Sequence, residues 1–201
     1  MAGGTVSAAI LAGGLATRFD GRDKSALIVD PSDGRTILER QIAALTPLTA
    51  DVLIVGRARH PSARTIADRI AGSGPIGGLE AALDAARGDA LILLACDMPF
   101  VTTPLLAYLV DAAGEAIDAV VPQTERGYHP ICAVYRRTAR DAVLRQLTAK
   151  RFKMVDLLAR LRVRVVAPDE IERFGDCHRL LANVNTAADF ASLVARQRHE
   201  L

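Results

Sequence analysis

Short apolar runs alternate with amphipathic stretches along this chain of 201 residues, and this alternation limits the folds that the chain can adopt. The apolar runs have the length of buried strands, and the stretches between them repeat apolar residues at helical spacing. Such an alternation is typical of a mainly parallel sheet with helices on both faces. We therefore expect a Rossmann-like, doubly wound α/β fold. The predicted strands lie at residues 6–11, 52–55, 90–95, 119–121 and 131–135, and the helical patterns at residues 37–48, 78–86 and 104–113.

Three positions carry the signals of a helix start. Thr36 with Glu39, and Thr186 with Asp189, have the spacing of capping boxes, in which two side chains satisfy backbone groups at the first turn. The Thr-Pro pair at 103–104 predicts an N-cap at the threonine and a proline at the first helical position. Residues 123–130 break the regular alternation, and we expect a substrate loop or a hairpin there.

Composition limits the size and the partners of the protein. With 201 residues, of which 50% are hydrophobic, the chain can bury one substantial core, so we expect a single domain over residues 1–201. The net charge is +2, and the basic residues are scattered along the chain. This distribution argues against a nucleic-acid surface and leaves anionic small molecules as ligands.

Cysteine usage and hydropathy indicate the compartment. Cys96, Cys132 and Cys177 are an odd set without C-x-x-C spacing, which argues against a disulfide framework and a zinc ribbon. The start of the chain does not have the pattern of a signal peptide, and no apolar run reaches the length of a membrane span. We expect a cytoplasmic protein without a membrane partner, in which Cys96 is a packing residue.

The first predicted strand leads into a glycine turn with two cations. Gly13 and Gly14 allow backbone N–H groups to approach phosphate oxygens closely, and Arg18 and Lys24 add positive charge. The segment matches neither the G-x-G-x-x-G fingerprint of dinucleotide-binding folds nor a Walker loop. It predicts a cradle for the phosphates of a nucleotide. The alternative is an ordinary strand-to-helix turn with solvated cations.

A carboxylate follows the predicted strand at residues 90–95. In open α/β sheets the ligand crevice lies outside the carboxyl ends of the strands, so Asp97 is expected to face the same crevice as Gly13. Magnesium prefers oxygen ligands and usually takes one or two protein carboxylates, with phosphates and water completing its shell. Asp97 is therefore the candidate Mg²⁺ ligand. The alternative is a turn-forming aspartate ahead of Pro99.

A second glycine-rich segment precedes the helical pattern at residues 78–86. Gly77 and Gly78 allow a base or a phosphate to approach the N–H groups at the start of a helix. Upstream, Asp68 can accept hydrogen bonds from N1–H and the exocyclic amine of guanine. An equally simple interpretation is a solvated aspartate with Arg64 and Arg69 near it in sequence.

Five short motifs occur in order along nearly the whole chain. They are Leu11-Ala12-Gly13-Gly14 with Arg18 and Lys24, Gly74-Pro75-Ile76-Gly77-Gly78, Cys96-Asp97-Met98-Pro99, His129-Pro130, and Asn183-Val184-Asn185-Thr186. Together they resemble the molybdenum cofactor guanylyltransferase family, within the broader group of MobA-like nucleotidyltransferases. The resemblance implies a nucleotide-diphospho-sugar-transferase-like fold. It also implies a reaction in which GTP and molybdopterin give molybdopterin guanine dinucleotide and pyrophosphate, with Mg²⁺ required.

The roles of the nucleotide-binding and catalytic residues fall on the first three motifs and on Asp68. A terminal phosphate of molybdopterin is already anionic near neutral pH, so the reaction needs positioning and charge neutralisation rather than a catalytic base. The resemblance implies that Leu11, Ala12, Gly13 and Asp68 contact GTP, that Lys24 binds its phosphates and that Asp97 holds Mg²⁺. From the glycine turns we add Gly14, Gly77 and Gly78 as nucleotide contacts, and from the charge of the leaving group we expect Arg18 to hold the departing pyrophosphate.

The resemblance also favours contacts between the pterin and Asn183 and Asn185, whose amides offer donors and acceptors. Local turn capping is the alternative role of these two asparagines. His129 is a candidate contact to the second substrate, although a turn histidine held by packing is as good an interpretation. The basic residues Lys150, Arg151 and Lys153 can attract an anionic pterin or simply be solvated.

Two positions depart from the family pattern, and two other functions stay open. Asp20 stands where the family often has glycine, and Arg57 where it often has an asparagine contact. A cytidylyltransferase would use the same phosphate cradle, but the Cys-Asp-Met-Pro motif favours guanine over the Asn-Asp-Gln-Pro pattern of cytidylyl relatives. A nucleotide-binding adaptor for molybdoenzyme maturation is the non-catalytic alternative. Contacts with a molybdoenzyme or a maturation protein are compatible with each of these functions.

Overall fold

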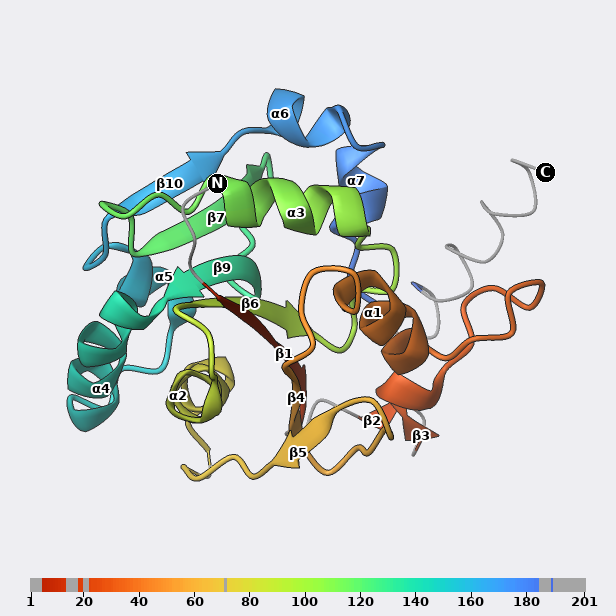
Figure 1. The fold of residues 1–201 in the computed structure, drawn as a ribbon, viewed down its shortest axis with the longest axis horizontal. Helices are drawn as coiled ribbons and strands as arrows, with labels where there is room; N and C mark the ends of the chain where they lie inside the picture. Colours follow the sequence, from red (N-terminus) through yellow and green to blue (C-terminus); the bar gives the residue numbers. More distant parts are fainter. Residues whose placement is uncertain (1–4, 14–17, 20–21, 71, 185–188, 190–201) are drawn as a thin grey trace.

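The computed structural model describes residues 5–13, 18–19, 22–70, 72–184 and 189, and for residues 18–19 and 22–23 it describes the backbone. The described chain forms a mixed, mainly parallel sheet flanked by helices, as expected (Figure 1). The strand order is β10-β7-β9-β6-β1-β4-β5, and β8 pairs with β7. The strands of this sheet are β1 (Val6–Ala12), β4 (Val52–Gly56), β5 (Arg64–Ile66), β6 (Ala90–Ala95), β7 (Ala119–Thr124), β8 (Gly127–Tyr128), β9 (Cys132–Arg136) and β10 (Val163–Val166).

The central strands pair in parallel, and β9 runs against them. β1 pairs in parallel with both β4 and β6, whereas β9 is antiparallel to β6 and to β7. β7 and β8 form the hairpin that the break at residues 123–130 indicated as one possibility. A separate small antiparallel pair is formed by β2 (Arg18–Phe19) and β3 (Arg22–Asp23).

The two edge strands did not appear in the sequence pattern. β5 has three residues that are all partly exposed, and β10 has one buried residue among four. Because an edge strand is covered less completely than a central one, neither of these segments needs the continuous apolar run by which the central strands are recognised.

Helices cover both faces of the sheet, and each face has its own apolar cluster. Along β1, Ala8, Ile10 and Ala12 pack into one cluster and Ala9 into the other, as the alternation of a strand requires. Figure 1 shows α2 and α4 on the opposite side of the sheet from α3 and α6. The first cluster includes residues of α1 (Ile37–Leu45), α3 (Thr103–Asp111), α6 (Pro168–Glu172) and α7 (Cys177–Leu180), and the second those of α2 (Pro75–Ala85), α4 (Arg140–Thr148) and α5 (Met154–Leu158).

One of the predicted helix starts is confirmed, and one is wrong by a residue. Thr36 caps α1 in a full capping box with Glu39. The N-cap of α3 is Thr102 rather than Thr103, because the Thr103 hydroxyl donates to the carbonyl oxygen of Ala44 at 2.8 Å instead of capping its own helix. Thr186 lies outside the described residues.

Two further sequence expectations, on the cysteines and on membrane spans, can be compared with the structure. Cys96, Cys132 and Cys177 are buried, and the three thiols form no disulfide with one another. Burial raises the pKa of the Cys132 thiol to about 12, which keeps it protonated. Within the described ranges, every helix falls short of the length and apolarity that crossing a bilayer demands.

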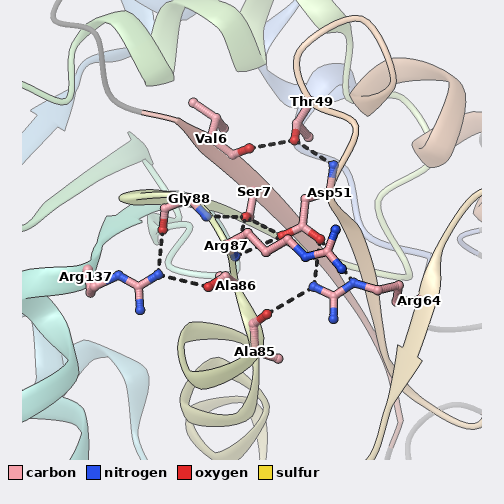
Figure 2. A network of polar contacts seen from close by, with 10 residues as sticks. All are labelled: Val6, Ser7, Thr49, Asp51, Arg64, Ala85, Ala86, Arg87, Gly88 and Arg137. Carbon is pink, nitrogen blue, oxygen red and sulfur yellow. Dashed lines mark hydrogen bonds and ion pairs between the residues drawn. The ribbon is translucent and has the colours of Figure 1, made fainter.

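A partly buried polar network joins the other ends of the central strands (Figure 2). Ser7 on β1 donates to Oδ2 of Asp51 at 2.6 Å and accepts from the N–H of Gly88 at 2.8 Å. Arg64 on β5 donates to Oδ1 of Asp51 at 2.7 Å, and the N–H of Arg87 donates to Oδ2 at 3.0 Å. The network therefore holds together the segments that lead into β1, β4 and β6.

The charge of Asp51 makes this network sensitive to acid. Burial raises the pKa of Asp51, but hydrogen bonds from Ser7, Arg87 and Arg64 outweigh it and leave the pKa below its ordinary value. A carboxylate with a lowered pKa contributes stability that is present above its unfolded pKa of about 4 and is lost as the pH falls through the folded pKa.

We expect Asp51→Asn to lower the free energy of unfolding by about 2 kcal/mol at pH 7 and by less at pH 3, because acid neutralises the same group in the wild type. Urea unfolding at both pH values measures this difference. Asp111→Asn, at the exposed C-terminal end of α3, is the control. A loss of equal size at both pH values would show that the charge of Asp51 is not the stabilising feature.

Gly56 allows the ends of β1 and β4 to approach each other. Its φ is +134°, and a Cβ there would collide with the carbonyl group of Ala12 and lie 2.9 Å from the backbone nitrogen of Gly13. Both obstacles are backbone atoms, which cannot move aside without shifting the strand end.

We expect Gly56→Ala to lower the free energy of unfolding by about 3 kcal/mol, because it adds both backbone strain and a steric clash. Gly34→Ala is the matched control, since Gly34 also has a positive φ of +67° but has nothing within 4 Å of the added Cβ. It should cost about 1 kcal/mol. Chemical unfolding of both variants measures the difference, and equal losses would contradict the close approach of the two strand ends.

Candidate active site

The carboxyl ends of β1 and β6 carry two of the segments that the sequence singled out. Within the sheet, Leu11 is paired with Ala95. One residue further on, the N–H of Cys96 donates to the carbonyl oxygen of Leu11 at 3.1 Å. Ala12 and Gly13 therefore leave the sheet beside Asp97, as the parallel register of β1 and β6 requires.

Asp97 is held by a segment from the far end of the chain. Asn183 Nδ2 donates to Asp97 Oδ1 at 2.8 Å, and the N–H of Val184 donates to the Asp97 carbonyl oxygen at 2.8 Å. These two bonds fix both the side chain and the backbone of Asp97. The structure thus brings together Asp97 and Asn183, which the sequence assigned to different halves of the site.

Lys24 provides a buried positive charge close to Asp97. It begins the short 3-10 helix η2 (Lys24–Ala26), and 5% of its surface is exposed. Burial raises the pKa of the Asp97 carboxyl above its ordinary value, while the hydrogen bond from Asn183 and the charge of Lys24 act in the opposite direction. A half-buried carboxylate whose neighbours compensate it only in part favours the approach of another cation.

The start of α2 packs against the end of β1. A Cβ on Gly78 would lie 2.7 Å from Cδ2 of Leu11, and a Cβ on Gly77 would collide with Ser73 Oγ and lie 3.2 Å from Asp68 Oδ1. These glycines therefore let the first turn of α2 lie directly on the strand end. Gly74, the N-cap of α2, has a φ of +64° and an open flank.

Asp68 lies on the exposed side of this first turn. Its Oδ1 accepts a hydrogen bond from the N–H of Ile70 at 3.1 Å, which shapes the loop before α2. It lies next to Gly77, and its exposed carboxylate is accessible to a ligand; its contact with a nucleotide stays a prediction.

The site therefore consists of two sides that meet at the end of β1. Leu11, Ala12, Gly13, Asp68, Gly77 and Gly78 lie on the α2 side, and Lys24, Asp97 and Asn183 lie on the β6 side. Gly14 and Asn185 lie outside the described residues, and so does the side chain of Arg18.

Comparison with known proteins identifies the family of the chain. Residues 8–171 match the model of the MobA-like NTP transferase domain. The chain belongs to the MobA-like NTP transferase family.

Individual members of the family can be compared in more detail. A protein of Pelotomaculum thermopropionicum named "Probable molybdenum cofactor guanylyltransferase" is 33% identical over 185 residues, which cover 90% of this chain and 87% of that protein. The crystal structure of molybdopterin-guanine dinucleotide biosynthesis protein A from Archaeoglobus fulgidus superimposes with a TM-score of 0.79 at 25% identity, covering 96% of this chain and 99% of that chain.

The fold extends beyond guanylyltransferases. The 2-C-methyl-D-erythritol 4-phosphate cytidylyltransferase of Thermus thermophilus superimposes with a TM-score of 0.70 at 20% identity, over 96% of this chain and 99% of that chain. At this identity the similarity concerns the fold alone. The architecture of this MobA-like protein is thus shared by enzymes that use different bases.

The donor set of this MobA-like protein limits how a metal ion can bind. In the described part of the chain, no group of three or more His, Cys, Asp or Glu side chains is arranged to hold an ion. Asp97 provides a carboxylate at the edge of the sheet, with Asn183 already bound to one of its oxygens. This arrangement fits Mg²⁺, which usually takes few protein ligands and completes its shell with phosphate and water.

Gln41 is a supporting residue that the sequence pattern did not identify. It lies on the apolar face of α1 and is 2% exposed, and its Nε2 donates to the carbonyl oxygens of Ala95 at 2.7 Å and Met98 at 3.1 Å. These bonds support the turn that carries Asp97. A polar residue at a buried helical position was the available signal, but the sequence does not show which carbonyl groups it binds.

His129 and the basic residues after α4 have evident structural roles. His129 Nε2 lies 3.0 Å from Thr124 Oγ1 within the β7–β8 hairpin, and burial, with Arg126 nearby, lowers the pKa of the imidazole. Lys150 has a φ of +53° after the end of α4, where the N–H of Arg151 donates to the carbonyl oxygen of Gln146 at 3.0 Å. These features support the packing interpretation of His129 and a helix-ending turn at Lys150.

The electrostatic arrangement around Asp97 can be tested without catalysis. We expect Lys24→Met and Asn183→Ala each to raise the pKa of Asp97 further, because each removes an interaction that favours the charged carboxylate. Carboxyl NMR with ¹³C-labelled aspartate, followed over a pH titration, measures the change. Lys153→Met removes an exposed lysine as a control, and an unchanged Asp97 titration in both test variants would contradict the proximity of the three side chains.

Proposed function

We propose that this protein transfers GMP from GTP to molybdopterin, forming molybdopterin guanine dinucleotide and pyrophosphate. The observation that carries the proposal is the meeting of Lys24, Asp97 and Asn183 at the glycine-bearing end of β1. Relatives named for this activity support it, at identities up to 33% over most of the chain.

GTP would bind on the α2 side of the site. The backbone around Gly13 and the N-terminal end of α2 lie at this edge, and Gly74, the N-cap of α2, has an open flank that a phosphate or base can approach. Gly77 and Gly78 instead allow α2 to pack on Ser73 and Leu11, and their N–H groups donate to the carbonyl oxygen of Gly74.

The Asp68 carboxylate can accept from N1–H and the exocyclic amine of guanine. Cytosine presents an acceptor, N3, beside its amine, and a carboxylate repels that acceptor. Asp68 therefore favours GTP over CTP.

Asp97 would hold a Mg²⁺ ion together with phosphate oxygens and water. When bound, the ion neutralises part of the negative charge on the phosphates of the nucleotide. Asn183 orients the Asp97 carboxylate through the 2.8 Å hydrogen bond to Oδ1. Gln41 holds the turn that carries Asp97 through its hydrogen bond to the carbonyl oxygen of Ala95. Because Asp97 is the carboxylate proposed as the protein ligand among the described residues, affinity for Mg²⁺ would depend on the bound nucleotide.

The chain's own residues would position the two phosphorylated substrates. The acceptor phosphate is ionised near neutral pH, so its attack on the α-phosphate needs alignment and charge neutralisation rather than a general base. The ammonium group of Lys24 is buried, and a charge interacts more strongly with a phosphate where water is excluded. Lys24 would therefore stabilise negative charge on the α-phosphate. We keep Arg18 as the proposed partner of the departing pyrophosphate.

Two other functions remain as alternatives. A cytidylyltransferase is compatible with the fold, and a non-catalytic adaptor for molybdoenzyme maturation would bind nucleotide without turnover. Lys24 and Asn183 beside Asp97 argue against the adaptor, because a nucleotide-binding protein without catalysis needs no compensated carboxylate at the phosphate edge.

Pyrophosphate release distinguishes the three functions. With Mg²⁺ and molybdopterin, we expect release from GTP, much less from CTP, and none when molybdopterin is omitted. Asp97→Ala should lower the GTP-dependent rate by about 100- to 1,000-fold, as is typical for the loss of one charge-stabilising contact. Asp111→Ala is the control. Pyrophosphate release from CTP but not from GTP would support the cytidylyltransferase. If neither nucleotide releases pyrophosphate, the non-catalytic adaptor is favoured.

A further inference from the structure

The loop between β5 and α2 carries Asp68, the carboxylate proposed to recognise guanine. Asp68 Oδ1 accepts from the N–H of Ile70 at 3.1 Å, and the Ser73 hydroxyl donates to the carbonyl oxygen of Ile70 at 2.6 Å. Ser73 is buried, whereas Asp68, Arg69 and Ile70 are exposed. The loop is thus anchored where it enters α2, and the part that carries Asp68 lies at the surface.

An ion pair attaches this exposed part of the loop to the last turn of α2. Arg69 Nη1 lies 2.7 Å from Asp84 Oδ2, and the hydrogen bond from Arg69 is the largest of the influences that hold the pKa of Asp84 below its ordinary value. On β5, Arg64 Nη2 donates to the carbonyl oxygen of Ala85 at 3.0 Å, in the same turn. Because Asp68 and Arg69 share a peptide bond, a fixed Arg69 restricts the positions that the Asp68 carboxylate can take.

Asp84 has a second partner on the other side of its helix. Arg140 of α4 donates from Nη2 to Asp84 Oδ1 at 2.7 Å and lies 3.9 Å from Glu80, one turn earlier in α2. Figure 1 shows α2 between β5 and α4. The two arginines bind different oxygens of Asp84, so each ion pair can be removed by a substitution that leaves the other in place.

We propose that Arg69 and Asp84 are positioning residues for base recognition, and that their ion pair holds the loop where the Asp68 carboxylate meets N1–H and the exocyclic amine of guanine. The inference rests on the proposed function and adds a determinant of base selectivity outside the nucleotide contacts. An exposed ion pair contributes little to stability, so its effect is expected on the orientation of Asp68 rather than on folding. A carboxylate that receives two hydrogen bonds from one base edge is sensitive to small displacements.

Direct binding of the nucleotide by Arg69 is the competing explanation. The Arg69 side chain is 60% exposed, and a guanidinium is a good ligand for phosphate. The two roles differ toward inosine triphosphate (ITP), whose base keeps the N1–H of guanine but lacks the exocyclic amine. A phosphate contact serves GTP and ITP equally, whereas a well-placed Asp68 favours GTP.

The experiment determines kcat/KM for transfer of GMP from GTP and of IMP from ITP to molybdopterin, together with the Kd of both nucleotides by calorimetry. We expect Asp68→Ala to lower the preference for GTP over ITP about tenfold, because a hydrogen bond to a charged group is lost. Arg69→Ala and Asp84→Ala should each lower this preference about threefold. Arg69→Lys should keep most of it, since a lysine can pair with Asp84. Arg140→Ala, which removes the other partner of Asp84, is the matched control and should keep the wild-type preference.

A double variant separates positioning from direct contact. Arg69→Ala introduced into Asp68→Ala should leave the preference at the value of Asp68→Ala, because Arg69 acts through Asp68. A further fall in that background, or an equal loss of kcat/KM for GTP and ITP in Arg69→Ala, would overturn the inference. A fall of the same size in Arg140→Ala would also overturn it, since the contact between α2 and α4 would then be the determinant.

Failure of the proposed function gives a different result. If the wild type transfers no GMP to molybdopterin, the transferase function is wrong, while the ratio of the two Kd values still reports on Asp68 and its loop. An active wild type that does not distinguish GTP from ITP would overturn the inference and leave the transfer reaction in place.

Discussion

The hydrogen bond between Asn183 and Asp97 joins residues that are 86 positions apart and connects the two halves of the site. Burial is the largest influence on the pKa of the Asp97 carboxyl, and it raises that pKa. Without the hydrogen bond from Asn183, fewer interactions would offset the free-energy cost of burying the charged carboxylate. The neighbouring bond from the N–H of Val184 to the Asp97 carbonyl oxygen places the final described segment against the end of β6. The candidate site therefore depends on contacts that form only when the whole sheet is assembled.

The carboxylates at the two ends of the central strands have different surroundings. At the end that holds Ser7, the Asp51 carboxylate accepts hydrogen bonds from serine, arginine and backbone donors, and the pKa of Asp51 lies below the ordinary value. At the opposite end, in the candidate site, Asp97 accepts fewer hydrogen bonds, and burial raises the pKa of its carboxyl. One carboxylate is thus saturated by the protein, which suits a structural role. The other is left with capacity for a cation, which suits binding and catalysis.

The position of Gly13 and Asp97 at one edge of the sheet could be predicted from the sequence, whereas their roles toward phosphate and metal stay predictions. Glycines after the first strand and a carboxylate after the strand at 90–95 are recognisable without a structure, since parallel strands end at a common edge. The helix start at Thr103 was misplaced because its hydroxyl binds Ala44, a residue remote in sequence. Gln41 was missed for the same reason, since its partners at Ala95 and Met98 lie on another element.

The amino-acid order alone specified the alternation of strands and helices, the capping box at Thr36 and the order of the motifs, because apolar periodicity and capping act over a few residues. The tertiary structure decided that β9 runs antiparallel between β6 and β7, that Lys24 lies buried near Asp97, and that Arg179 lies over Phe100 beside a groove. These features depend on the distances between residues that are far apart in the chain. Local sequence patterns do not determine those distances, because the packing of the elements sets them.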